Sequence, residues 1–170
     1  MQVPRRQHET RKGLYTDAER RRRDSSPWTV VQAILAPLQF LIFIISLGLI
    51  LRTLATGEGG WLANASVLVK TMVLYTIMVT GSLWEKDVFG KYLFAPAFFW
   101  EDAVSFVVIA LHTAYIICLM TGWLDGSALL ILALVAYAAY MLNAAQFLLK
   151  LRAARLERQA PDFNQAEAAS

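Results

Sequence analysis

The sequence predicts an all-α membrane protein, a bundle of four transmembrane helices, on three observations. Hydrophobic residues make up 57% of the 170 positions, above the roughly 45–50% that is usual in soluble domains. The excess lies in four long apolar runs, and the mean hydropathy is +0.46. Each run has about the 20 residues that a helix needs to cross ~30 Å of hydrocarbon. The runs do not alternate as barrel strands do, so helices are expected.

Composition divides the chain into three parts. We expect a basic arm over residues 1–27, a four-helix transmembrane domain over residues 28–150, and a basic, then disordered tail over residues 151–170. The predicted spans cover about residues 28–54, 63–84, 97–121 and 127–149.

The arm carries the start signals of two helices. Thr16 and Glu19 have the spacing of a capping box, so a short interfacial helix is expected over Tyr15–Arg23. Ser26 fits the N-cap of the next helix, and Pro27 fits its first turn. The four arginines at 20–23 are interpreted as a topology signal in contact with anionic lipid, because no nucleic-acid fold accompanies them.

The distribution of basic residues predicts the orientation. Eight of the sixteen Lys and Arg residues precede the first span, and four follow the last. Lys86 and Lys91 lie between the second and third spans, whereas the other two loops have none. The positive-inside rule therefore puts both termini and the connector Trp84–Asp102 in the cytoplasm. Arg52 and Lys70 are expected near the opposite face, where long side chains can reach the interface.

Polar residues inside the spans recur on single helix faces. Gln32, Gln39 and Ser46 are seven residues apart, which predicts hydrogen bonds between helices. Three polar residues of the fourth span share a side at the connector's end of the membrane: Asn143, Gln146 and Lys150.

The third span carries an acid and an imidazole on one stripe. Glu101 and His112 are eleven positions apart, which leaves them about 20° apart around a helix and ~16 Å apart along it. His112 is open to three interpretations: a hydrogen-bonded core histidine, a member of a proton relay, or an axial ligand to a metallated tetrapyrrole. Asp102 points about 100° away from Glu101, and a capping role at the helix N-terminus stays open for it.

The connector WEKDVFGKYLFAPAFFWED is the strongest candidate for a functional site. It holds four carboxyl groups that could move protons: Glu85, Asp87, Glu101 and Asp102. It also holds seven rings that could stack on a flat ligand: Trp84, Phe89, Tyr92, Phe94, Phe98, Phe99 and Trp100. Surface ion pairing of the acids and an aromatic belt at the membrane interface are the alternatives.

These residues carry a family resemblance. The runs that match are Ser26–Phe43, Val69–Ser105, Ala110–Tyr115 and Asn143–Leu156. They resemble the 3-vinyl bacteriochlorophyllide hydratase family of photosynthetic bacteria, most specifically in the connector. The resemblance implies a hydro-lyase of bacteriochlorophyll a biosynthesis in the bacterial inner, or intracytoplasmic, membrane. Such an enzyme adds water to the C3 vinyl group of chlorophyllide a or 3-vinyl bacteriochlorophyllide a, which gives a 3-(1-hydroxyethyl) group.

This chemistry needs an acid to protonate the terminal vinyl carbon and a group to orient water toward the resulting cation. We expect Glu101 as the acid, because it enters the membrane beside apolar rings that favour its protonated form. Glu85, Asp87 or Asp102 would then place the water. His112 would assist proton supply or ligate the magnesium of the substrate.

The aromatic residues of the connector would hold the macrocycle. The substrate propionate would pair with a basic residue among Lys86, Lys91 and Lys150, and the amides of Asn143 and Gln146 lie at the same depth. No cofactor other than the substrate's own magnesium is expected. Cys118 is the single cysteine, and no Cys/His spacing predicts a metal held by the protein.

Two other functions stay open. A non-catalytic pigment-binding or assembly subunit of a photosynthetic complex would use His112 to hold the pigment. A proton-coupled transporter is disfavoured, because charged groups gather at one face and no inverted repeat is visible. The expected partners are the chlorophyllide substrate and the lipid bilayer, without nucleic acid. Other pigment-biosynthesis enzymes and a second copy of the chain are left open as partners.

Overall fold

The computed structural model describes residues 14–159, and the side chains of residues 14–156. Within this range the chain forms five helices: α1 (Asp17–Ser25), α2 (Pro27–Thr56), α3 (Gly60–Phe89), α4 (Phe99–Thr121) and α5 (Gly126–Gln159). The last four contain stretches long and apolar enough to cross a membrane. The predicted all-α membrane protein is therefore confirmed. The rest of the predicted arm and tail lies outside the described residues.

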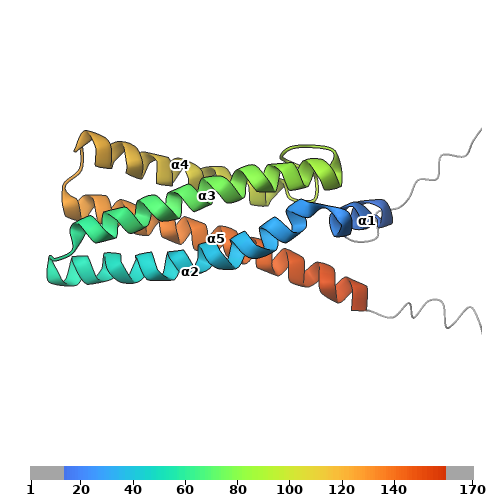
Figure 1. Ribbon diagram of the computed structural model, residues 1–170, viewed down its shortest axis with the longest axis horizontal. Coiled ribbons are helices and arrows are strands. Elements are labelled where there is room, and N and C mark those ends of the chain that lie inside the picture. The colour runs from blue at the N-terminus through green and yellow to red at the C-terminus, as the bar shows by residue number, and fades with distance from the viewer. Residues whose placement is uncertain (1–13, 160–170) are drawn as a thin grey trace, which may run out of the picture.

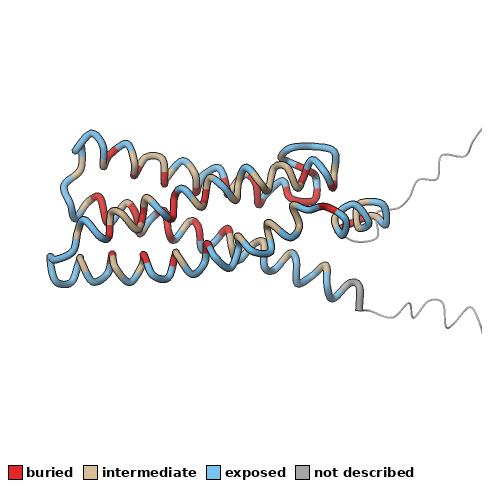
Figure 2. The backbone as a smooth tube through the Cα atoms, in the orientation of Figure 1, coloured by how far each residue is buried: buried red, intermediate tan, exposed pale blue. Residues whose placement is uncertain are grey.

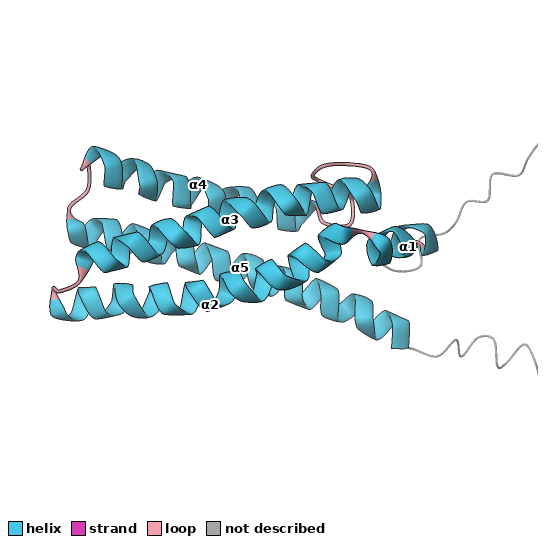
Figure 3. Ribbon diagram, viewed as in Figure 1, coloured by secondary structure: helices cyan, strands magenta, loops and turns pink. Residues whose placement is uncertain are grey.

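The long helices form two antiparallel hairpins, α2–α3 and α4–α5, which pack against each other (Figure 1). Tight turns join the helices of each hairpin. Gly57 and Gly122 end α2 and α4 with φ of 75° and 65°, a backbone conformation that glycine adopts without strain. We call this end of the bundle the turn end. The opposite end holds α1, the described end of α5 and the α3–α4 loop, residues 90–98 (Figure 3), and is called the connector end.

The short helix α1 begins with the predicted capping box. Thr16 N donates to Glu19 Oε2 at 2.8 Å, and Glu19 N donates to Thr16 Oγ1 at 3.3 Å. Ser26 is the N-cap residue of α2 and Pro27 lies in its first turn, as predicted. The Ser26 hydroxyl, however, donates to Asp87 Oδ2 on α3 at 2.8 Å. This bond ties the α1–α2 junction to α3.

Buried residues line the interior between the hairpins, and the outer faces are exposed (Figure 2). Polar pairs join the helices there. Gln32 Nε2 of α2 donates to Thr80 Oγ1 of α3 at 2.7 Å. The Ser46 hydroxyl shares hydrogen bonds of 2.6 Å with Tyr137 and Ser66. The predicted interhelical bonding of the α2 stripe is thus confirmed at two of its positions, and such bonds hold helices together where lipid surrounds them.

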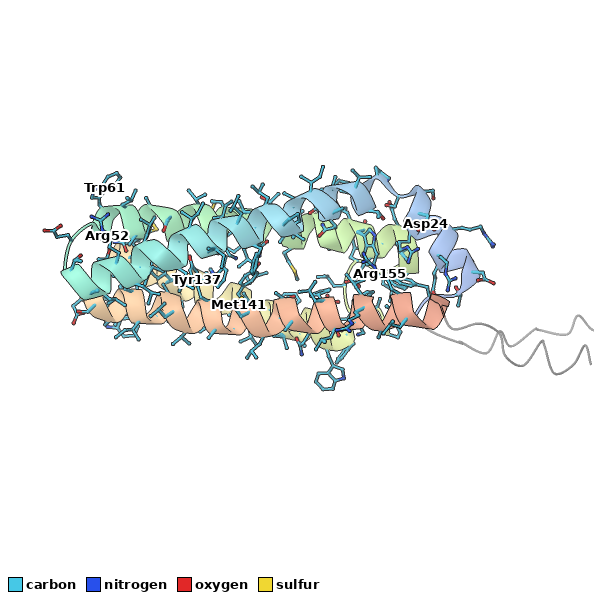
Figure 4. All side chains as sticks on the ribbon, turned by 90° about the horizontal axis from the view of Figure 1, so that it is seen from below. Asp24, Arg52, Trp61, Tyr137, Met141 and Arg155 are labelled. Carbon is cyan, nitrogen blue, oxygen red and sulfur yellow. The ribbon has the colours of Figure 1, made fainter. Side chains whose placement is uncertain are left out.

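Lys70 corrects one prediction. It does not reach the membrane interface but is fully buried within the bundle, with Nζ 3.8 Å from the centroid of the Tyr140 ring. Lys70 lies ten residues into α3, which is ~15 Å from the turn end and too deep for its side chain to reach water. Arg52, by contrast, is exposed and lies at the turn end with Trp61, as predicted (Figure 4).

Helix α3 extends beyond the predicted span at the connector end. The apolar run ends at Trp84, but the helix continues to Phe89, so Glu85 and Asp87 are helical. Gly90 then ends α3 with φ of 79°. Helix α5 likewise continues past Lys150 to residue 159. Polar residues that leave the apolar part of a membrane can remain helical, and here they project acids and bases from rigid helices.

Candidate active site

The connector end brings three of the four predicted carboxyl groups together inside the bundle. Glu85 comes from the last turns of α3, and Glu101 and Asp102 come from the first turn of α4. Their exposed fractions are 5%, 6% and 3%, respectively. Carboxyl groups this deeply buried require hydrogen-bond or ionic partners, and each of the three has at least one.

Glu85 and Asp102 accept hydrogen bonds from the connector backbone. Phe94 N donates to Asp102 Oδ2 at 2.7 Å, and Ala95 N donates to Glu85 Oε2 at 3.1 Å. The two carboxyl groups also hydrogen-bond to each other. Two ionised carboxylates have no donor between them, so this bond requires a proton on one of the two groups. Glu85 and Asp102 are called the carboxyl pair below, and their contact across α3 and α4 favours a proton shared between them.

Phe94, whose backbone N–H donates to Asp102 of the carboxyl pair, has a strained backbone conformation. Phe94 has φ of 57°, in the left-handed region that residues other than glycine rarely adopt. Such a conformation costs about 1–3 kcal/mol and persists only where the surroundings impose it. The bond from Phe94 N to Asp102 contributes to that constraint. Strain of this kind clusters at active sites and ligand clamps, which makes the connector a functional candidate on grounds other than its composition.

Asp102 lies in the first turn of its own helix, where a negative charge still fits the helix dipole, but its side chain makes no capping hydrogen bond there. The N-cap residue of α4 is Phe98, and no side chain caps it. Asp102 instead reaches back to the connector, because its position one turn into α4 directs it toward Phe94 and Glu85.

Glu101 lies on the adjoining face of α4 and forms an ion pair. Its Oε2 is 2.5 Å from Lys150 Nζ of α5. The Lys150 ammonium also lies 5.1 Å from the centroid of the Phe98 ring. A carboxylate in an ion pair has no proton to give, so this geometry does not suit Glu101 to the role of the acid.

Two amides of α5 follow the same interface into the bundle. Asn143 Nδ2 donates to Ser105 Oγ at 2.7 Å, and Ser105 Oγ donates to the Glu101 carbonyl at 2.9 Å. Asn143 Oδ1 and Gln146 Oε1 are buried and have no hydrogen-bond partner among the described residues. Three residues of α5 were predicted to share one side of the helix: Asn143, Gln146 and Lys150. Two of them, Asn143 and Lys150, therefore contact residues near the start of α4.

Asp87 does not join the other acids. It is exposed and accepts the hydrogen bond from Ser26 described above.

Of the basic residues predicted to meet a substrate carboxylate, Lys150 is occupied by Glu101. Lys86 Nζ donates to the Gly90 carbonyl at 3.2 Å and lies over the Tyr92 ring, whereas Lys91 is exposed.

The seven aromatic residues of the connector region divide into two sets. Trp84, Phe89 and Phe98 pack with Tyr15 and Phe147, which the sequence did not single out. Trp84 and Phe98 centroids are 5.6 Å apart, and Phe98 stacks on Phe147 at 5.8 Å. The other four, called the exposed rings below, are Tyr92, Phe94, Phe99 and Trp100.

The exposed rings lie next to the carboxyl pair along the chain. Their exposed fractions run from 39% for Phe94 to 71% for Trp100. Phe94 contacts Phe99 at 5.5 Å between centroids and stacks on Phe106 at 5.5 Å. An apolar surface of this kind can hold a flat ligand at the membrane interface.

His112 lies apart from this site. It is fully buried, with Nδ1 2.8 Å from the Val108 carbonyl and its ring 5.8 Å from the Tyr137 ring. A carbonyl accepts only from an N–H, so Nδ1 carries the proton, and Nε2 has no partner among the described residues. Within residues 14–156 no group of three or more His, Cys, Asp or Glu side chains could hold a metal ion.

A family model described as 2-vinyl bacteriochlorophyllide hydratase matches residues 15–153, which include every site residue described above. The chain belongs to this hydratase family. Two relatives carry the same name. The one from Rhodobacter capsulatus is 63% identical over 156 residues, which cover 92% of this chain and 91% of the relative. The one from Cereibacter sphaeroides is 65% identical over 147 residues, with 86% and 91% covered. No solved structure matches the chain.

Membership of the 2-vinyl bacteriochlorophyllide hydratase family confirms the resemblance and makes the protein an enzyme, a hydro-lyase. The family name counts the vinyl-bearing carbon as position 2, whereas the sequence-based expectation used position 3. Both numbers refer to the same carbon under two numberings of the tetrapyrrole ring.

Proposed function

We propose that this protein hydrates the vinyl group of a chlorophyllide or bacteriochlorophyllide at the connector end, as a step of bacteriochlorophyll a biosynthesis. The carboxyl pair carries the proposal: it is a buried proton donor beside an exposed aromatic surface, in a member of a hydratase family. Positive residues concentrated at this end favour its placement on the cytoplasmic side of the inner membrane of a photosynthetic bacterium.

In the proposed reaction, the proton of the carboxyl pair adds to the terminal CH2 of the vinyl group. The positive charge forms on the carbon attached to the macrocycle, where conjugation spreads it. A water oxygen then forms the new C–O bond at that carbon and loses a proton to Glu101. Transfer of this proton to the neighbouring carboxyl pair restores the starting state, so the net change is the addition of one water molecule.

The ion pair with Lys150 has a defined task in this scheme. It fixes the position of the Glu101 carboxylate, and an anion beside the carbocation stabilises that cation. The mechanism therefore assigns proton donation to Glu85 and Asp102, and proton acceptance to Glu101. It needs neither Asp87 nor His112.

The macrocycle is held by the exposed rings at the membrane interface, where a pigment precursor arrives from the lipid. Lys91 is the base best placed for the substrate propionate, because Lys150 and Lys86 already have partners. The substrate brings its own magnesium, and the proposed chemistry uses no further cofactor. Other pigment-biosynthesis enzymes and a second copy of the chain stay predictions as partners.

Asp102→Asn and Glu85→Gln test the proposal. Each variant keeps an oxygen for the connector N–H but removes the shared acidic proton, so hydration should slow by about 100-fold or more. Turnover is followed in purified membranes with vinyl chlorophyllide, through the absorption change that accompanies loss of vinyl conjugation. Glu58→Gln, at the exposed turn end, is the matched control and should retain full activity.

Pigment binding is measured on the same samples by the absorption shift of the bound pigment. Variants that bind pigment yet do not hydrate it support the proposed acid. Turnover at the wild-type rate in both variants would remove the carboxyl pair as the proton donor. A wild-type protein that binds pigment stoichiometrically without converting it would instead favour an assembly subunit.

A further inference from the structure

The interface between α4 and α5 offers two hydrogen-bond acceptors that the protein itself does not use. Asn143 is 92% buried, since its exposed fraction is 8%, and its amide nitrogen is engaged by Ser105. Asn143 Oδ1 and Gln146 Oε1 both lie out of contact with solvent and have no partner among the described residues. A buried acceptor without a donor costs about 1–3 kcal/mol, so two such groups three positions apart on α5 call for a ligand with donors.

We propose that Asn143 and Gln146 bind the water molecule that the hydration consumes. This inference rests on the proposed function and adds the second substrate to it. The two residues are three positions apart on α5, which places their Cβ atoms about 5–6 Å apart on one face. One water molecule can donate both of its O–H groups across such a gap, with O···O distances of about 2.8 Å.

The position of these acceptors fits the reaction. Asn143 is joined through Ser105 to the Glu101 backbone, and Lys150, one turn beyond Gln146, is paired with the Glu101 carboxylate. Phe147, next to Gln146, stacks on Phe98 at the start of α4. A water held between Asn143 and Gln146 therefore lies along the same α4–α5 interface as Glu101, the proposed acceptor of its proton.

The chemistry of the two substrates decides which of them occupies the site. The rim of a chlorophyllide carries carbonyl and carboxylate oxygens, which accept hydrogen bonds and cannot satisfy amide oxygens. Water has two donors. When both are given to the amides, the lone pairs of its oxygen point away from α5. As a lone pair forms the C–O bond, one O–H turns from its amide to the Glu101 carboxylate, which takes the proton. After the C–O bond forms, the remaining O–H of the product can still donate to one of the two amides.

A water bound at a fixed place attacks one face of the planar cation. The hydrated carbon is a stereocentre, so the wild-type enzyme should produce one epimer of the 1-hydroxyethyl group in excess. Removing one of the two acceptors leaves the water less well oriented. The epimer ratio should then move toward one to one, and kcat should fall about tenfold, while KM for the pigment stays within about twofold.

The test uses the full-length protein in membranes, vinyl chlorophyllide as substrate, and chiral chromatography of the product. Gln146→Leu and Asn143→Leu remove an acceptor, whereas Gln146→Glu keeps one and should restore the wild-type epimer ratio. Gln39→Leu removes an unpartnered amide oxygen elsewhere in the bundle and should leave the ratio unchanged.

The outcomes separate the two proposals. A wild-type protein without hydration activity would overturn the proposed function. An active wild type that makes equal amounts of both epimers, or leucine variants with the wild-type ratio and kcat, would overturn the water site alone. If a leucine variant fails to fold, Gln146→Glu compared with Gln146→Met, which has a similar volume and no amide, gives the same contrast.

Discussion

Two regions of the bundle hold buried ionisable groups, and they differ in how those groups are paired. At the connector end, Glu85 and Asp102 accept hydrogen bonds from the connector backbone, and Glu101 pairs with Lys150 of α5. In the middle of the bundle, Lys70 Nζ and His112 Nε2 have no hydrogen-bond partner among the described residues. We call this second region, which includes Tyr137 and Tyr140, the deep layer. Tyr137 lies in it between α2 and α5 (Figure 4).

An ionisable residue at membrane depth is a functional candidate by default, but the connector end and the deep layer differ in whether a substrate could reach such a residue. The carboxyl pair is buried too, but it lies close along the chain to the exposed rings, where the proposed function brings a substrate from the lipid. The deep layer is enclosed, and both Lys70 and His112 are fully buried. Catalysis requires access of the substrate to the proton, and of the two regions only the connector end has an exposed aromatic surface next to its acids.

Distance also separates the two regions. His112 lies eleven residues beyond Glu101 on α4, ~16 Å along the helix axis. The vinyl carbons are only a few bonds from the central magnesium of the pigment. A single bound pigment therefore cannot have its magnesium on His112 and its vinyl group at Glu101, and the stripe that they share in the sequence does not make them one site.

The largest effect is expected when a buried acid at the connector end loses its partner. Lys150→Met leaves the Glu101 carboxylate buried without its cation, which should lower stability by about 2 kcal/mol, since a buried charged group is left unpaired. Hydratase turnover should fall at the same time. The unfolding temperature in detergent and the rate of vinyl loss measure the two effects. Lys150→Arg keeps the charge and should recover most of both, so equal loss in the two variants would contradict the assigned role.

A smaller effect is expected in the deep layer from His112→Phe. The ring stacking on Tyr137 is kept, but the bond from Nδ1 to the Val108 carbonyl is lost. Stability should decrease by about 1 kcal/mol, and hydration should stay within twofold of the wild type. Loss of turnover with normal thermal stability would show that the two regions act together and would return His112 to the mechanism.

The smallest change is expected from Lys70→Met, which keeps the length of the side chain and removes its amine. An ammonium without an acidic partner gains only its contact with the Tyr140 ring, so the apolar substitute should be neutral or stabilising by up to about 1 kcal/mol. Thermal unfolding of the purified protein in detergent provides the measurement. A decrease of more than about 2 kcal/mol would mean that Lys70 is paired in the membrane and that the deep layer is not merely structural.

Local patterns in the sequence were enough for the helices and for several of their contacts. The capping box at Thr16 and Glu19 and the helix start at Ser26 depend on residues within one turn of each other. The bonding of Gln32 and Ser46 follows from one polar face on an apolar helix, which has to turn inward in lipid. Clustering of acids and rings in the connector predicted the candidate site, and the structure brings three of those acids together.

The roles within that site were decided by tertiary contacts. The sequence placed Glu101 as the acid, but Lys150, 49 residues away, pairs with it. Helical spacing also could not show that Asp102 reaches back to Phe94 and meets Glu85 of another helix. Likewise, only packing against Tyr15 and Phe147 separated the buried aromatic residues from the exposed rings.

The sequence by itself thus determined that the chain forms membrane helices, which of their faces are polar and to which family it belongs. Hydropathy and helical periodicity are properties of neighbouring residues, so they can be read along the chain. The tertiary structure alone decided which carboxyl groups lie together, which one pairs with a lysine and which amide oxygens have no partner among the described residues. Protonation and hydrogen bonding depend on atoms within a few ångströms, and in this bundle those atoms come from different helices.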